Sequence, residues 1–185
     1  MGNSGKFKQL LKKANKSFIP DAFTTMPIYD FCNEYNLDKD FLQFITANIL
    51  QITMAYDRKI YMAGGALRRW FQGTKLEDFI QDFDFWFGPD RISKTNSQRI
   101  DNVKEIIQYI TSIYGLTYHS RNEHYNITYS GDYTFQFMTA EVLHIFNPTD
   151  FLKKFDLYHS MFITDGNDII FHNHALKDAK EKSTN

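Results

Sequence analysis

The stretch that decides the fold is Tyr61–Gly73, YMAGGALRRWFQG, followed after eight residues by Asp82–Phe87, DFDFWF. The first segment is an apolar run that ends at Gly64 and Gly65 and is followed by a short amphipathic stretch. This order predicts a strand, a tight turn and a helix. The second segment alternates carboxylates with aromatic residues at a period of two, which predicts another strand.

The two carboxylates of the second segment, Asp82 and Asp84, should share one face, because successive side chains of a strand point to opposite faces. They would lie about 7 Å apart and repel each other unless a cation lies between them or water reaches both. Such a pair suits Mg²⁺ or Mn²⁺, which use one or two carboxylates together with substrate phosphates. A chance acidic pair at an exposed strand end is the alternative.

The turn at Gly64 and Gly65 supports this hypothesis with a possible phosphate-binding site. Glycine permits a close backbone approach by a ligand, and a helix start offers free N–H groups and a positive end to a phosphate. A phosphate seat beside a metal site of paired aspartates is the arrangement that nucleotidyl transfer needs. Gly64 and Gly65 are therefore candidate phosphate-binding residues, and Asp82 and Asp84 are candidate metal ligands.

Length and composition predict one globular domain with a single core. The chain has 185 residues, a net charge of −1, 43% hydrophobic and 17% aromatic residues, which exclude a disordered chain. No run of 18 apolar residues and no N-terminal apolar signal segment occurs, so we expect no membrane association. The single cysteine, Cys32, indicates a reducing cytoplasm. The oligomeric state stays open.

Residues 1–27 are predicted to form a basic N-terminal arm and loop, and residues 28–185 the folded domain. Residues 1–20 contain five lysines and no acidic residue. Such a segment fits either a phosphate-seeking arm or a solvated amphipathic helix, and the second interpretation is favoured because runs of charge are usually solvated.

Hydrophobic periodicity predicts the remaining elements. Helices are expected over 28–35, 38–57, 66–72, 97–115, from Asn147-Pro148, and over 174–182; strands are expected over 59–63, 82–87, 116–120, 124–129, 133–139, and in a hairpin of 157–164 with 168–172. This order predicts an α/β (α+β) domain in which helices flank a central sheet.

The stretch GGALRRWFQG…DFDF resembles the signature of the polymerase-β-type nucleotidyltransferase superfamily. The pattern is most similar to the head domain of CCA-adding enzymes and bacterial poly(A) polymerases, and the likeness extends to small phage- and virus-encoded members. The matching positions are Gly64, Gly65, Leu67, Arg68, Phe71, Gly73, Asp82 and Asp84. Arg69 stands where that family has Asp, and the gap before Asp82 is longer. A weaker match at KKFDLYHSMF places Lys153, Lys154 and Asp156 in basic and acidic positions, so the likeness spans residues 58–175.

The resemblance implies a role for each matched residue. Asp82 and Asp84 would hold Mg²⁺ or Mn²⁺ and act in catalysis together with Asp156, whereas Gly64, Gly65, Arg68, Gln136 and Lys154 would bind the nucleotide. Many members carry a third carboxylate on a later strand, and here Gln136 stands at that position. Asp156 or Glu141 would then have to replace it.

The function implied by the resemblance is a metal-dependent nucleotidyltransferase with a mixed nucleotidyltransferase-like sheet. It would move a nucleoside monophosphate from an NTP such as ATP to an acceptor hydroxyl and release pyrophosphate. The acceptor would be an RNA or tRNA 3′ end, a protein or a small molecule, and the location the cytoplasm, of the host if the protein is phage-encoded. The alternative is a catalytically degenerate member that serves as a nucleotide-, RNA- or partner-binding inhibitor module.

Overall fold

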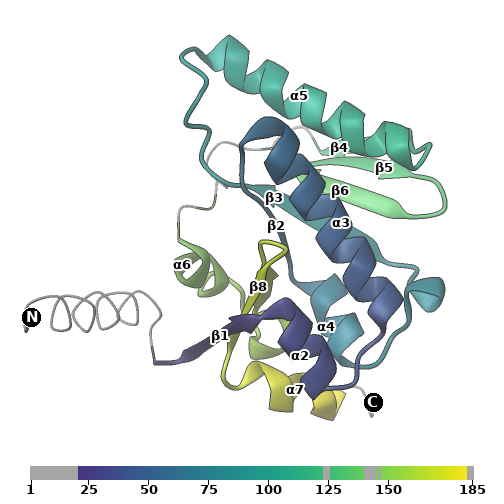
Figure 1. Ribbon diagram of the computed structural model, residues 1–185, viewed down its shortest axis with the longest axis vertical. Coiled ribbons are helices and arrows are strands. Elements are labelled where there is room, and N and C mark those ends of the chain that lie inside the picture. Colours follow the sequence, from purple (N-terminus) through teal and green to yellow (C-terminus); the bar gives the residue numbers. More distant parts are fainter. Residues whose placement is uncertain (1–20, 123–125, 140–144, 146, 183–185) are drawn as a thin grey trace, which may run out of the picture.

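The computed structural model describes residues 21–122, 126–139, 145 and 147–182 (Figure 1). The prediction of a solvated basic helix over residues 1–20 and the candidate Glu141 lie outside the described residues. The last residues of the segment 1–27, which the sequence predicts as loop, form strand β1 (Phe23–Pro27) at one edge of the sheet.

A single eight-stranded sheet forms the centre of the protein, in the order β1-β8-β7-β2-β3-β6-β5-β4. Its other strands are β2 (Ile60–Ala63), β3 (Asp82–Phe87), β4 (Thr117–Asn122), β5 (Asn126–Ser130), β6 (Thr134–Met138), β7 (Phe162–Thr164) and β8 (Asp168–His172). Strands β3 and β6 pair in parallel, whereas the other neighbouring strands pair antiparallel. The sheet is therefore mixed, and the predicted fold class is confirmed.

The helices are α2 (Ile28–Glu34), α3 (Lys39–Tyr56), α4 (Gly65–Phe71), α5 (Asn96–Ile113), α6 (Pro148–Leu152) and α7 (Ala175–Lys182), with the 3-10 turns η1 (Leu76–Asp78) and η3 (Tyr158–Ser160). Side chains that accept hydrogen bonds from backbone N–H groups cap the first turns of several helices. Asp38 accepts a hydrogen bond from the Phe41 N–H at α3, and Asn147 accepts from Thr149 and Asp150 at α6, as its Asn-Pro sequence predicts. No helix of the described residues is both long and apolar enough to cross a bilayer.

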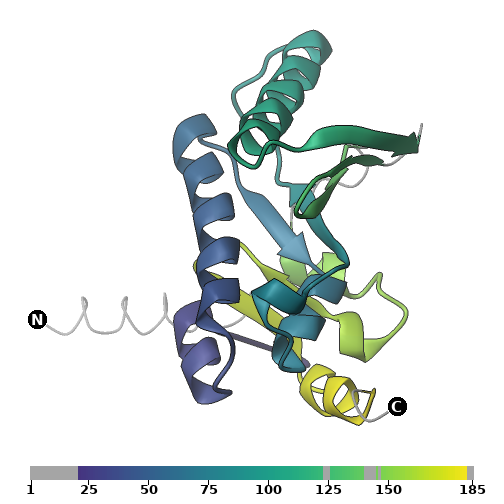
Figure 2. The same ribbon diagram turned by 90° about the vertical axis from the view of Figure 1, so that its right-hand side faces the viewer.

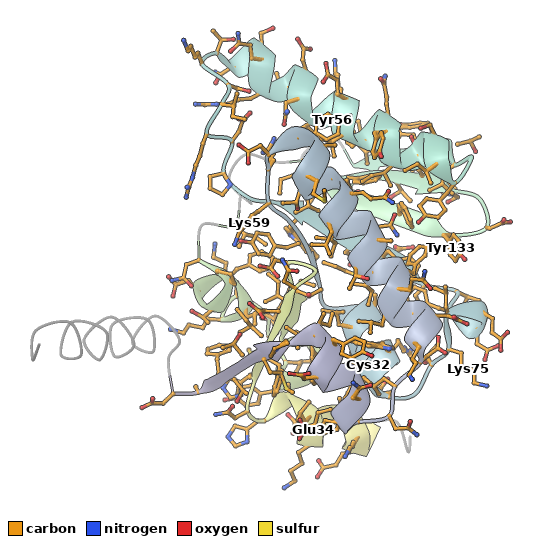
Figure 3. The ribbon with its side chains drawn as sticks, in the orientation of Figure 1. Cys32, Glu34, Tyr56, Lys59, Lys75 and Tyr133 are labelled. Atoms are coloured by element: carbon orange, nitrogen blue, oxygen red, sulfur yellow. The ribbon has the colours of Figure 1, made fainter. Side chains whose placement is uncertain are left out.

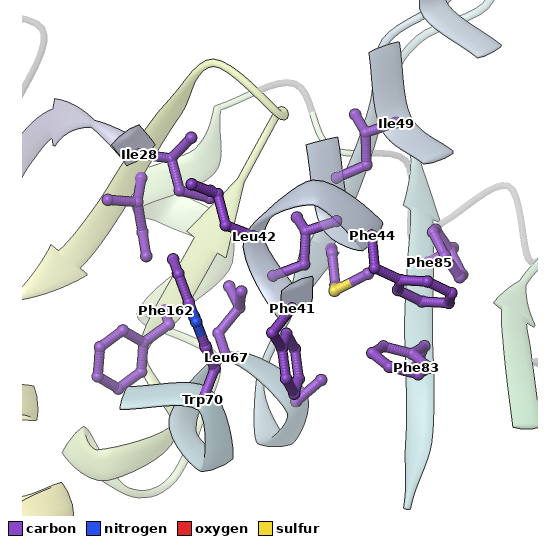
Figure 4. Packing of buried hydrophobic residues seen from close by; sticks show 14 of the residues in the cluster. Ile28, Phe41, Leu42, Phe44, Ile49, Leu67, Trp70, Phe83, Phe85 and Phe162 are labelled. Carbon is purple, nitrogen blue, oxygen red and sulfur yellow. The ribbon is translucent and has the colours of Figure 1, made fainter. Parts of the chain in front are cut away.

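The two faces of the sheet are covered differently. Helices α2, α3, α4, α5 and α7 contribute to the larger core, which Figure 4 shows from close by around Phe41, Trp70 and Phe83. In Figure 2, α3 runs along one side of the molecule and the hairpin of β4 and β5 projects from the other. The opposite face carries a smaller cluster, in which Trp86 packs edge-on to Phe151 of α6 at 5.3 Å between ring centroids. The candidate site, with Asp82 and Asp84, lies on the face of the sheet that carries this smaller cluster.

Candidate functional site

The paired aspartates lie on β3 as the sequence predicts. The burial of this strand alternates: Asp82 is exposed, Phe83 is fully buried, Asp84 is half-buried and Phe85 is fully buried. The two phenylalanines enter the larger core, so the carboxylates lie on the opposite face, beside the smaller cluster. The interpretation of Asp82–Phe87 as a strand with two chemically distinct faces is confirmed.

Gln136 is brought next to Asp84 by the parallel pairing of β3 with β6. The register places Asp82 opposite Thr134 and Asp84 opposite Gln136, and the next strand places Thr128 opposite Gln136. Paired positions on neighbouring strands point to the same face. Gln136, which the resemblance predicts at the position of the third carboxylate, therefore lies beside Asp84, and its side chain is an amide.

Asp84 has an unusual electrostatic environment. Burial, together with the neighbouring charge of Asp82, raises the pKa of Asp84 to about 7. Its Oδ1 atom is buried and has no hydrogen-bond partner. A buried carboxylate oxygen without a donor is costly when it is charged, so this position favours either a proton or a bound cation.

The donor set of the site suits a hard divalent cation. Among the residues that the structure describes, no group of three or more His, Cys, Asp or Glu side chains could hold a metal ion. Mg²⁺, however, commonly takes only one or two carboxylates from the protein and completes its octahedron with water and substrate phosphates. Asp82 and Asp84, whose Oδ1 is buried without a hydrogen-bond partner, fit this requirement, whereas Gln136 could supply only a neutral amide oxygen.

The glycine turn connects β2 to α4. Gly64 has φ of 87° and ψ of −133°, a conformation that L side chains rarely adopt, and its N–H donates to the carbonyl of Phe162. Gly65 is the first residue of α4. A Cβ added at either glycine would meet no heavy atom within 4 Å, so open space lies in front of this backbone. Gly64 is required by its dihedral angles, and Gly65 leaves room for a ligand.

The two arginines of α4 differ in burial. Arg68 is half-buried and Arg69 is exposed, as expected for helical neighbours about 100° apart. The Nε of Arg68 is buried without a partner, and burial, with the charge of Arg69, lowers the pKa of Arg68. Arg68 Nε and Asp84 Oδ1 are thus two of the three buried side-chain atoms without a hydrogen-bond partner in the described part of the chain; the third, Asp90 Oδ2, lies 3.9 Å from Arg58 Nη1.

Lys154 and Asp156 lie in the exposed segment that follows α6. Phe155 between them contacts Trp86, with ring centroids 6.4 Å apart, so this segment lies over the same face as Asp84. Lys153 pairs with Asp150 at 3.8 Å rather than with Asp156. No hydrogen bond or ion pair within the described residues joins Lys154 or Asp156 to the paired aspartates, so these two remain predictions from the resemblance.

A cavity of about 560 Å³ lies elsewhere and contains none of the predicted site residues. It opens between the start of α3, η1 and the turn before β6, and Figure 3 labels two of its lining residues, Lys75 and Tyr133. Sequence reasoning missed it because its lining comes from four separate segments. Only the tertiary structure brings the acidic residues of α3 and η1 together with Tyr114 and Tyr133.

The fold is that of a nucleotidyltransferase-like domain. The structure resembles that of a CCA-adding enzyme in its apo form I, with a TM-score of 0.57, 14% identity and coverage of 85% of this chain and 35% of that chain. A CCA-adding enzyme in complex with CTP has a TM-score of 0.57 and 15% identity, with coverage of 85% of this chain and 34% of that chain. The Thermotoga maritima CCA-adding enzyme in complex with tRNA has a TM-score of 0.55 and 14% identity, with coverage of 85% of this chain and 35% of that chain. The chain thus spans about a third of the length of these proteins.

The amino-acid sequence assigns the chain to a protein family. A family model described as Gabija anti-defense 2 family protein matches residues 23–182, and the chain therefore belongs to this family. A comparison with curated proteins found no match. The matched segment begins at β1, the edge strand that the sequence predicted as loop.

Proposed function

We propose that this protein is a metal-dependent nucleotidyltransferase that moves a nucleoside monophosphate from an NTP to an acceptor hydroxyl. The observation that carries the proposal is the pair of Asp82 and Asp84 on one strand face, with a buried, unpartnered Oδ1 and a pKa of about 7 for Asp84. A carboxylate in this state gains most from a bound cation. The likeness of the fold to CCA-adding enzymes supports the same class of reaction.

Each residue of the site has a proposed role. Asp82 and Asp84 hold Mg²⁺ or Mn²⁺, the open backbone at Gly64 and Gly65 receives the triphosphate, and Arg68 uses its unpartnered Nε toward the nucleotide. A bound ion would neutralise the phosphate charge and make the acceptor hydroxyl easier to deprotonate. The acceptor oxygen forms a bond to the α-phosphorus as the bond to pyrophosphate breaks, and the protein's contribution is mainly in-line positioning.

The acceptor hydroxyl must lose its proton to a base. Gln136 cannot be that base, because a side-chain amide does not take up a proton near neutral pH. Asp156 is the proposed replacement, since its segment lies over the face of Asp84, and Lys154 in that segment is the proposed phosphate ligand. Structures of CCA-adding enzymes with CTP and with tRNA make an NTP donor and an RNA 3′ end the first candidates to test. Protein and small-molecule hydroxyls are the other acceptors.

A second candidate function is a catalytically degenerate domain that binds a nucleotide, RNA or a protein partner. The neutral Gln136 beside Asp84 favours it, because the third carboxylate of the family pattern is missing. The family description also favours it, since an anti-defense protein can act by binding a defence component as an inhibitor. In that case the protein would work in the cytoplasm of the cell whose defence it counters.

The first experiment is thermal melting with each of the four NTPs, with and without Mg²⁺ or Mn²⁺. A ligand at about a hundredfold excess over its Kd adds about 2.7 kcal/mol to the free energy of unfolding, which is about 5–10 °C for a domain of this size. The wild type should show a metal-dependent shift with at least one NTP. An Asp82→Asn/Asp84→Asn double variant should lose it.

The matched control is Asp101→Asn, which removes an exposed carboxylate from α5, away from the site. It should keep the shift. If a cooperatively melting wild type shows no shift with any NTP and metal, the enzyme proposal fails. If the double variant still counters the defence in cells, the partner-binding candidate is the correct one, because catalysis requires the two aspartates whereas a partner-binding surface does not.

A further inference from the structure

A groove lined by positively charged side chains lies between α5 and the hairpin of β4 and β5, two elements that Figure 2 shows next to each other. Its volume is about 210 Å³, and none of its described lining residues is acidic. Four cationic side chains line this basic groove: Arg58, Arg99, Lys104 and Arg121. Its lining residues Val103, Ile107 and Ile127 belong to or pack against the larger core, so the basic groove lies on the opposite face of the sheet from the proposed catalytic site.

One of these cations is built into the structure. Arg58 is 4% exposed; its Nε and Nη2 each donate to the Gly88 carbonyl at 3.2 Å, and its Nη1 donates to Asn102 Oδ1 at 2.8 Å. Its Nη1 also lies 3.9 Å from Asp90 Oδ2, so the negative charge of Asp90 offsets the positive charge of Arg58. Arg58 therefore fixes the back wall of the basic groove and contributes little net charge.

The other three cations form no ion pair with any residue that the structure describes. Arg99 donates to the neutral Asn96 Oδ1 at 3.3 Å, and no ion pair with a described residue involves Arg99, Lys104 or Arg121. Lys104 and Arg121 are exposed on α5 and β4, on the two sides of the basic groove. Like charges that line one groove repel one another, and a bound anion would reduce that repulsion.

The floor of the basic groove is aliphatic. Ile100, Val103 and Ile107 occupy successive turns of one face of α5, and Ile127 lies on β5 opposite Arg121. Ile100 is 53% exposed, so apolar surface is available for contact at the mouth. A helix face of this kind usually covers a core, whereas here its outer part meets solvent between cationic side chains.

We propose that the basic groove docks an acidic segment of a partner protein, with one aliphatic side chain seated on the floor and flanking carboxylates paired to Arg99, Lys104 and Arg121. The volume of about 210 Å³ is below the 300–1,000 Å³ typical of cofactor sites, yet it suffices for one anchoring side chain. None of the described lining residues is aromatic, whereas proteins that bind single-stranded nucleic acid stack the bases on aromatic rings. Charge complementarity therefore favours an acidic peptide over RNA.

This docking surface is independent of the proposed catalysis. It shares no residue with the Asp82–Asp84 site and lies across the sheet from it. A protein bound in the basic groove would leave the nucleotide site free, so the two sites can be tested separately.

The probe is a fluorescently labelled peptide of defined sequence, Asp-Glu-Leu-Leu-Glu-Asp, titrated by anisotropy. Binding should weaken as salt rises, because the contacts are surface charges. A Lys104→Glu/Arg121→Glu double variant should bind about tenfold more weakly or worse, and Ile100→Ser about fivefold more weakly, since it removes apolar contact. Lys39→Glu reverses the charge of an exposed lysine at the start of α3, outside the basic groove, and should bind as the wild type does.

Two comparison ligands decide the chemistry: a peptide with Asn and Gln in place of the acids, and an oligonucleotide of equal charge. Both should bind at least about tenfold more weakly than the acidic peptide. The proposal is overturned if the acidic peptide does not bind at millimolar concentration, if the double variant binds it equally well, or if the oligonucleotide binds more tightly. Cooperative thermal melting of the double variant near the wild-type melting temperature would show that it is folded.

Discussion

The buried carboxylate of Asp84 should make the stability of the metal-free protein fall as pH rises. In the unfolded chain this group has a pKa near 3.8, and in the folded protein the pKa is about 7. The folded state therefore holds the proton more tightly, so raising the pH between these two values destabilises it. The full cost above pH 7 is about three pKa units at 1.36 kcal/mol each, or about 4 kcal/mol.

The perturbation is Asp84→Asn, which keeps the size of the side chain and removes the titration. Between pH 5 and pH 8 the wild type should lose about 2.5 kcal/mol of unfolding free energy relative to the variant, because most of the shift is crossed in this window. The assay is urea denaturation in metal-free buffer at pH 5, 6, 7 and 8. Addition of Mn²⁺ at pH 8 should recover part of the loss in the wild type only.

Asp101→Asn, which changes an exposed carboxylate on α5, serves as the control and should follow the wild-type pH profile. Parallel profiles for the wild type and Asp84→Asn would refute the reasoning, because they would show that burial does not penalise the charged form of Asp84. A profile that rises with pH would contradict it more strongly, since the sign of the linkage would be reversed.

Further predictions concern the glycine turn, the neighbouring amide and the core. Gly64→Ala should lower stability by about 1–3 kcal/mol in urea titrations because of its φ of 87°, whereas Gly65→Ala should keep the fold and weaken the NTP-dependent melting shift; equal stability losses would contradict this. Gln136→Glu should lower the metal-free melting temperature at pH 8 by adding a charge beside Asp84, and Mn²⁺ should reverse the effect. Trp70→Ala should cost about 3–5 kcal/mol by urea unfolding, since Trp70 is fully buried and donates to the Asp38 carbonyl; a loss below about 1 kcal/mol would refute it.

Local signals in the sequence were sufficient for most elements. Helix α3 lies within the predicted range 38–57, and the structure shows Asp38 as its cap; α6 starts at the predicted Asn147-Pro148 pair. Both starts depend on hydrogen bonds or dihedral angles within one turn. The hairpin of β7 and β8 turns at Asp165-Gly166-Asn167 as expected, with Gly166 at φ of 90°. Its first arm is shorter than predicted, because residues 158–160 form η3 before β7 begins.

The pairing of strands that are far apart in the chain could not be predicted from the sequence. Strand β1 was predicted as loop because its FTTMP sequence ends in proline and carries no strong local strand pattern; its order comes from pairing with β8, about 145 residues away. Proline is tolerated there since β1 is the edge strand. The basic groove was equally hidden, because Arg58, Arg99 and Arg121 lie on three segments that only the fold brings together.

The sequence by itself determined the alternation of elements, the glycine turn, and the shared face of Asp82 and Asp84, since each depends on backbone geometry within a few residues. Only the tertiary structure decided that Gln136 lies beside Asp84, because parallel register is set by packing between distant strands. It also decided that Asp84 is buried enough to raise its pKa to about 7. Desolvation depends on every atom that surrounds a side chain, and no short segment of sequence contains that information.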